Sequence, residues 1–133
     1  MAPFVLSLKL LMQSLSCGNH QYGWDEELPK EIRSSISRVM MGLEHMEQMP
    51  IPRYFGHGLG TVVERQLHCF SDGSSMAYGA NAYLRLRDDA GHISCQLIMA
   101  KTRVSPAGKS LSIPRAELCG CAVAAALADI VHR

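Results

Sequence analysis

The sequence predicts an α+β fold, in which a helical N-terminal segment precedes a three-stranded antiparallel sheet and one packed helix. Apolar residues recur at helical spacing near the N-terminus and again from residue 30 onward. Three strand-like segments follow between residues 62 and 104, and an alanine-rich helical segment ends the chain. The change of pattern divides the chain into a helical linker, residues 1–60, and a sheet-containing domain, residues 61–133.

The N-terminal half is expected to hold two helices. Phe4, Val5 and the leucines that follow fit an amphipathic helix. A second helix is expected from Lys30 to Gln48, because Pro29 suits a first helical turn and two prolines at 50 and 52 cannot continue a helix. Its apolar stripe and nearby methionines, which we expect to fill a core, are Ile32, Ile36, Val39, Met40, Met41, Leu43, Met46 and Met49.

The second half reads as a hairpin-rich sheet followed by a helix. Strands are expected over 64–71, 77–86 and 93–104, with a turn at Asp88–Gly91 between the last two. Pro114 then opens a helix that runs to about His132. In the first strand, Leu67 and Cys69 or Phe70 are expected to face a core. In the second strand, Tyr78, Ala80, Ala82 and Leu84 are expected on one face, and in the third strand Ile93, Cys95, Leu97 and Met99 alternate with other residues.

Composition limits the classes of function. The chain has 133 residues and 47% hydrophobic content, which suits a folded domain, and a net charge of +1 gives no long-range attraction to nucleic acid. Five cysteines without zinc-like spacing argue against a disulfide framework. Lys9 interrupts the apolar N-terminal run, whereas the apolar region of a secretory signal peptide is not interrupted by a charge. The run is also too short to span a membrane. We therefore expect an intracellular protein that does not enter a membrane.

Two carboxylates are the candidates for chemistry. Asp72 follows an apolar strand, and Glu117 lies in the first turn of the last helix. A phosphodiester nuclease uses a divalent cation held by such oxygen ligands, and Ser71 and Ser74 could contact phosphate beside them. The alternative is structural: Asp-Gly is a common turn, and a glutamate near a helix start interacts well with the helix dipole. His57, His68 and His92 have no ligand spacing, and we assign them no role.

At these positions the sequence resembles a known family. The segments FSDGSSMAYGANAYLRLR, CQLIMAKTRVSP and SIPRAELCGCAVAAAL resemble the ribonuclease H-like region of BEL/Pao retrotransposon polyproteins. The upstream segments PFVLSLKLLMQSL, YGWDEELP and MPIPR resemble the part of those polyproteins that links reverse transcriptase to this region. The family also carries the label of a peptidase. Aspartic peptidase chemistry needs Asp-Thr/Ser-Gly, whereas this chain has Asp72-Gly73-Ser74 in one copy.

The resemblance implies the first half of a ribonuclease H-like fold and a retroelement nuclease that cuts RNA in RNA–DNA hybrids. Asp72 and Glu117 match the first and second catalytic acids and would bind Mg²⁺. The third and fourth acids would follow Arg133, so we expect this fragment to be inactive alone and its first strand to lack a neighbour. Gly73 and Ala116 depart from the family pattern, which often has alanine and leucine there.

A basic cluster suggests other functions. Lys101, Arg103, Lys109 and Arg115 flank the loop between the third strand and the last helix and could contact backbone phosphates. Without catalysis, the chain would be a remnant that binds nucleic acid, another protein or the rest of the polyprotein. The cations could also be solvated loop charges. A further alternative is a mobile-element fragment without a selected function.

Overall fold

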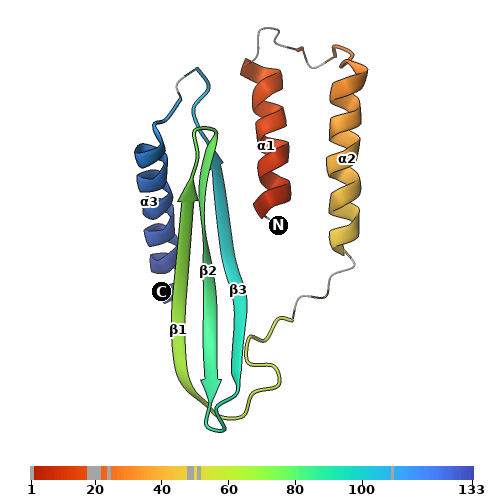
Figure 1. Cartoon of the computed structure of the whole chain (residues 1–133). Helices are drawn as coiled ribbons and strands as arrows, with labels where there is room; N and C mark the ends of the chain where they lie inside the picture. Colours follow the sequence, from red (N-terminus) through yellow and green to blue (C-terminus); the bar gives the residue numbers. More distant parts are fainter. Residues whose placement is uncertain (1, 18–21, 24, 48–49, 51, 109) are drawn as a thin grey trace.

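The computed structural model describes residues 2–17, 22–23, 25–47, 50, 52–108 and 110–133. These residues form three helices and one three-stranded antiparallel sheet, which confirms the α+β prediction (Figure 1). The elements are α1 (Ala2–Cys17), α2 (Lys30–Glu47), β1 (Val62–Gly73), β2 (Ala77–Asp88), β3 (Ile93–Val104) and α3 (Ile113–His132). The strands of the first hairpin are longer than the sequence predicts, because cross-strand pairing continues to Gly73 and Asp88.

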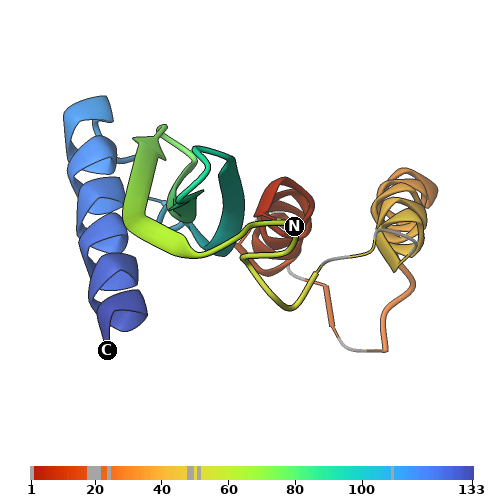
Figure 2. The same cartoon turned by 90° about the horizontal axis from the view of Figure 1, so that it is seen from below.

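The sheet lies between α3 and α1, and α2 lies beyond α1 (Figure 2). Its strand order is β1-β2-β3, so β1 and β3 are its edges in the described chain. Two side chains of α1 fasten this helix to β3 and the residue after it. Lys9 Nζ donates to the carbonyl of Thr102 at 2.7 Å, and Gln13 Nε2 donates to the carbonyl of Ser105 at 2.7 Å. The helical segment therefore contacts the sheet, and the predicted division near residue 60 stays a prediction.

The core lies between α3 and the sheet. The buried residues of α3 recur at three and four positions, which places them on one face: Ala116, Gly120, Val123 and Leu127. They pack on Ala80 and Ala82 of β2, with Leu67, Cys69, Tyr78 and Met99 around them. Leu127 is 1% exposed, and its burial contributes about 1.5–3 kcal/mol. Small side chains at this interface let the helix lie close to the sheet.

The face of β1 that packs against α3 carries Leu67 and Cys69, as predicted. Phe70 instead lies on the other face, where it is 57% exposed and meets the ring of Tyr83 edge-on at 6.1 Å between centroids. Successive residues of a strand alternate between the two faces, so Asp72 shares the face of Phe70. Asp72 therefore lies on the sheet face opposite α3.

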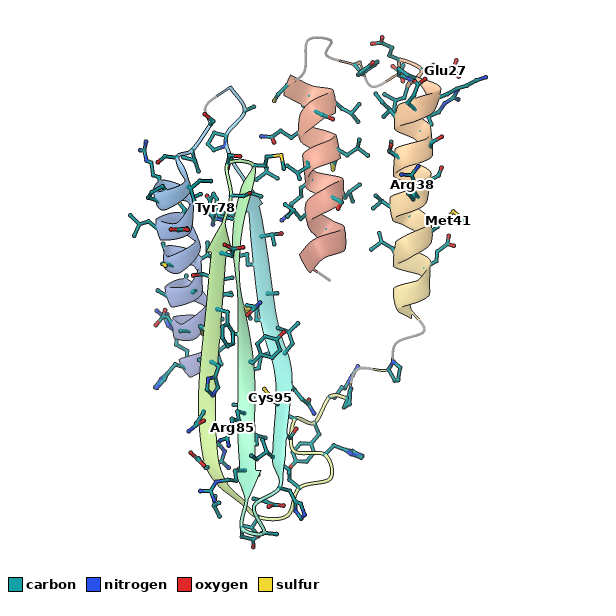
Figure 3. The ribbon with its side chains drawn as sticks, in the orientation of Figure 1. Glu27, Arg38, Met41, Tyr78, Arg85 and Cys95 are labelled. Carbon is teal, nitrogen blue, oxygen red and sulfur yellow. The ribbon has the colours of Figure 1, made fainter. Side chains whose placement is uncertain are left out.

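The alternation predicted for β3 is interrupted, so Ile93, Cys95, Leu97 and Met99 do not share one face. Met99 pairs with Ala82 and packs in the core, but Leu97 pairs with Tyr83, so the register shifts between them. A β-bulge of this kind moves the preceding residues to the other face. Ile93 and Leu97 consequently lie on the sheet face opposite α3, called the open face below, where they are 57% and 44% exposed. Cys95 is exposed as well, and Figure 3 shows it on β3 near Arg85 of β2.

The α2 helix begins and ends close to the predicted bounds, but its methionines do not all fill a core. Ile32, Ile36, Val39 and Leu43 are half-buried, whereas Met40 and Met41 are 49% and 61% exposed. Figure 3 shows Met41 pointing away from α1. The prediction that these two methionines fill a core is therefore wrong. Gln48 and Met49, and the side chain of Met46, lie outside the described part of the chain.

Asp88 fastens the segment before β1 to the β2–β3 hairpin. It was predicted to begin an exposed loop, but it ends β2 and is 1% exposed. Its carboxylate accepts hydrogen bonds from the backbone N–H groups of Gly60 and His92 and lies 3.0 Å from His92 Nδ1. The bond from Gly60 is the main cause that lowers the pKa of Asp88 to about 2. His92, to which we assigned no role, thus has a structural one.

Candidate active site

Asp72 is the next-to-last residue of β1, and its side chain is exposed. The backbone N–H of Gly73 donates to its Oδ1 at 2.8 Å, which orients the carboxylate. This single backbone donor leaves the other lone pairs of the carboxylate free. Asp72 is therefore an oriented and accessible carboxylate.

The first turns of α3 lie directly against the end of β1. A Cβ added at Gly73 would come within 2.4 Å of the carbonyl carbon of Ala116 and 2.6 Å of the backbone nitrogen of Glu117. A Cβ added at Gly120 would come within 2.9 Å of the carbonyl oxygen of Asp72. The two segments that carry the acids are thus in backbone contact, and glycine at 73 permits this approach. Both departures from the family pattern, Gly73 and Ala116, lie at this contact.

Glu117 is exposed on α3, next to the buried Ala116. Cys121 follows it by four residues, so both lie on one side of the helix. The Sγ of Cys121 is 3.5 Å from the Oγ of Ser71, one residue before Asp72 in β1. Asp72 lies on the sheet face opposite α3, so the two carboxylates do not face each other directly between the helix and the sheet. That they bind one cation stays a prediction.

The donor set fits a hard cation. Both acids offer oxygen atoms and are exposed at the ends of regular elements. Within the described residues, no group of three or more histidine, cysteine or acidic side chains is placed to hold a metal ion. Mg²⁺ commonly binds through one or two carboxylates, with water and substrate phosphates as its other ligands. One or two exposed carboxylates suit that mode of binding.

Comparison with known families agrees with this geometry. The family model described as Pao retrotransposon-like RNaseH-like domain matches residues 1–133. The chain belongs to this family. The comparison with curated proteins and the comparison with solved structures gave no match. In this Pao retrotransposon-like RNaseH-like domain, the two predicted acids lie on either side of the contact between the end of β1 and the start of α3.

Three of the four predicted basic residues of this Pao-family domain lie near the same end of the molecule. Lys101 and Arg103 pair with Ala80 and Tyr78, which face α3, so these cations project from the α3 side of β3. Figure 3 shows Tyr78 beside the first turns of α3. Arg115 is exposed in the first turn of α3. Lys109 lies outside the described residues.

Sequence reasoning missed a hollow beside Asp72. Its volume is about 320 Å³, and its wall includes Leu6 of α1, Gly79 and Asn81 of β2, and Thr102 of β3. Asn81 is the available sequence signal, since an asparagine inside a strand is unusual. The contribution of Leu6 depends on how α1 packs on the sheet, which no local pattern reveals.

The two serines beside Asp72 have different roles. The hydroxyl of Ser74 donates to the carbonyl of Ala77 and accepts from the N–H groups of Met76 and Ala77, so it shapes the β1–β2 turn. Ser71 contacts Cys121 and belongs to the interface between β1 and α3. The prediction that these serines contact phosphate stays untested, and the hydroxyl of Ser74 already has partners in the turn.

Proposed function

We propose that this domain is part of a retroelement polymerase polyprotein and contributes the first two acids of a nuclease that cuts RNA in RNA–DNA hybrids. The observation that carries the proposal is the backbone contact of Gly73 with Ala116 and Glu117, which brings the segments of both acids to one edge. Membership of the Pao retrotransposon-like RNaseH-like family supports the same substrate class.

Asp72 and Glu117 would hold Mg²⁺ at this edge. When bound, the cation supplies an activated water and neutralises charge on the leaving oxygen. The chain's own contribution would be positioning: the Gly73 N–H orients the carboxylate of Asp72, and α3 carries Glu117 just after its first turn, which has no acidic residue. Two carboxylates that hold one cation repel each other without it, so a pair at this site would favour binding of a positive ion.

The described residues supply two acids where a ribonuclease H-like site is expected to use four. With two carboxylates, the chain would bind a cation but would hold the scissile phosphate poorly. We therefore expect the isolated chain to bind Mg²⁺ without cutting a hybrid.

Magnesium titration of the purified chain, followed by NMR, tests the metal site. Resonances of Asp72 and Glu117 should shift together, and Asp72→Asn or Glu117→Gln should abolish the response at both positions. Asp89→Asn is the matched control, because Asp89 is exposed in the turn that follows β2. No response at Asp72 and Glu117, or the same response in all three variants, would overturn the metal site.

A second candidate function is binding without catalysis. Lys101, Arg103 and Arg115 are exposed on the α3 side of the molecule, where they can contact phosphates of a nucleic acid strand. This candidate would be favoured over the nuclease if the chain binds an RNA–DNA hybrid without magnesium and if the resonances of Asp72 and Glu117 do not respond to the cation.

A further inference from the structure

The outer face of α2 carries a regular row of exposed side chains. Exposed residues recur along it alternately at four and three positions, and we call this row the α2 seam: Lys30, Ser34, Ser37, Met41 and Glu44. Side chains with this spacing share one side of a helix and meet where two helices pack lengthwise. The half-buried residues of α2 lie on the opposite side and include Ile36 and Val39. Figure 2 shows α2 at the end of the molecule farthest from α3, with α1 beside it, so a partner can reach the seam.

A pocket lies in the middle of the seam, with a volume of about 550 Å³. Two short serine side chains lie among longer ones in its wall, which consists of Lys30, Arg33, Ser34, Ser37, Arg38 and Met41. Four helix residues at i, i+3, i+4 and i+7 form the hole that receives one side chain of a facing helix. The wall contains two such sets, the first from Lys30 to Ser37 and the second from Ser34 to Met41. Met41 is 61% exposed and is a flexible apolar side chain of the kind that fills such holes.

The seam is complementary to itself when a second copy of α2 runs antiparallel to it. A two-fold axis through Ser37 places each residue opposite the partner residue at about the same distance on the other side. Lys30 and Glu44 are each seven positions from Ser37, so Lys30 lies opposite the partner's Glu44. Ser34 lies opposite the partner's Met41, so each methionine enters the pocket of the other copy. The serine at the axis is small enough for the two helices to approach closely.

Charge favours a second copy over a nucleic acid strand as the partner of the seam. Lys30 and Glu44 are exposed, and within the described part of the chain neither has an ion-pair partner. Arg33 already pairs with Glu27, its Nη1 lying 2.9 Å from Oε1. A phosphate backbone along the seam would meet Glu44 at one end, whereas the antiparallel copy places a lysine there and forms an ion pair at each end.

We propose that the α2 seam binds a second copy of this chain through an antiparallel pair of α2 helices related by a two-fold axis at Ser37. The contact uses one face of one helix, so it is smaller than the interface of a stable dimer and the pair is weak. Arg38 lies beside the seam near the axis in both copies, and this approach of like charges weakens the pair further. The pair leaves Asp72 and Glu117, on β1 and α3, outside the contact, so it does not depend on nuclease function.

Two charge reversals test the pairing. Lys30→Glu opposes two acids in each contact, and Glu44→Lys opposes two lysines, so each variant alone should dimerise about tenfold more weakly than the parent chain. Mixed in equal amounts, the two variants should bind each other about as tightly as the parent chain binds itself, because every contact again joins opposite charges. Each reversal brings to its end of α2 the charge that the helix dipole favours, so the variants should fold.

Sedimentation equilibrium at several protein concentrations measures these affinities. Every chain, the parent included, carries Phe70→Lys, because Phe70 is 57% exposed beside the unpaired edge of β1, a separate place for association. Asp89→Lys is the control for the change in charge, since Asp89 is exposed in the turn after β2 and should leave the affinity unchanged. Met41→Ser should weaken the dimer several-fold because the pocket loses the side chain that fills it. Met12→Ser should not, although Met12 is 59% exposed on α1.

The proposal is overturned if a single reversal dimerises as tightly as the parent chain, or if Asp89→Lys weakens the dimer as much as the reversals do. A mixture of the two reversals that associates no better than each variant alone also overturns it, as does a parent chain that stays monomeric at every concentration. If a monomeric parent chain binds an RNA–DNA hybrid and Lys30→Glu weakens that binding, the seam contacts a phosphate backbone instead.

Discussion

The backbone of Gly73 at the end of β1 lies against the backbone of Ala116 in the first turn of α3. A Cβ at residue 73 would come within 2.4 Å of the Ala116 carbonyl carbon, so alanine would force the helix outward. We predict that Gly73→Ala lowers the free energy of unfolding by about 1–3 kcal/mol, as overpacking does. Denaturant unfolding measures this loss, and magnesium affinity should fall with it because Glu117 moves.

Gly23→Ala is the control for this prediction. A Cβ at residue 23 would meet nothing closer than the Cβ of Glu26 at 4.0 Å, so a loss caused by crowding should be absent there. Equal stability of the Gly73→Ala variant and the parent chain would mean that α3 adjusts without cost. The close approach would then have no part in placing Glu117.

Local pattern predicted the element order of this domain, because the periods of its apolar residues differ between helices and strands. The prediction failed where pairing between distant segments determines which side chains are buried. The core face of β3 reverses at a bulge set by its pairing with β2, so Ile93, Cys95 and Leu97 lie on the open face. Asp88 reads locally as a turn residue, and only the return of Gly60 to the hairpin buries it.

The candidate site shows the same limit. Asp72 and Glu117 were found from short motifs, but the sequence does not reveal that their segments are in backbone contact through Gly73, Ala116 and Gly120. The hollow beside them needs β1, β2, β3 and α1 together. Contacts between segments far apart in the chain therefore account for most of what sequence reasoning missed.

The buried carboxylate of Asp88 predicts a pH dependence of stability. Its pKa falls from 3.8 to about 2 on folding, mainly because the Gly60 N–H donates to it. A carboxylate whose pKa is lower in the folded state than in the unfolded state stabilises the folded protein at pH values above its unfolded-state pKa. This stabilisation is lost as the pH falls through the folded-state pKa. The contribution should be complete above about pH 4 and decline between about pH 4 and pH 2.

Thermal melts of the parent chain and Asp88→Asn should show this window. At neutral pH the variant should melt several degrees lower, because asparagine has no charge and presents an N–H₂ group where donors already crowd. The difference should shrink as the pH approaches 2. Asp89→Asn, in the adjacent turn, should change little at any pH. A constant difference between the parent and Asp88→Asn across the whole range would show that ionisation of Asp88 is not the cause.

The cations of β3 predict a salt dependence of nucleic-acid binding. Replacing Lys101 and Arg103 together by alanine should weaken binding of an RNA–DNA hybrid and reduce the slope of log affinity against log salt by about one per lost phosphate contact. Fluorescence anisotropy at several salt concentrations measures both. Arg38→Ala is the control, because Arg38 is exposed on α2 at a distance from the sheet (Figure 3). An unchanged slope in the double variant would exclude phosphate contacts by these two cations.

The open face of the sheet predicts self-association. β1 is an edge strand, and beside its unpaired backbone groups Phe70 is 57% exposed, with Ile93 and Leu97 exposed on the same face. An apolar edge of this kind favours pairing with another chain. The mass measured by light scattering should therefore rise with protein concentration, and Phe70→Lys should reduce the rise, at a cost of about 0.5–1.5 kcal/mol for the lost contact with Tyr83.

Met12→Lys is the control that distinguishes association through the β1 edge from association through any exposed apolar side chain, because Met12 is 59% exposed on α1 and does not belong to the sheet. If Met12→Lys reduces association as much as Phe70→Lys, the contact does not depend on the β1 edge. A parent chain that stays monomeric at every concentration would show that the unpaired groups of β1 are adequately satisfied by water. In that case strand twist and the charged pairs of Glu64 with Arg85 and Arg87 would be sufficient protection for this edge.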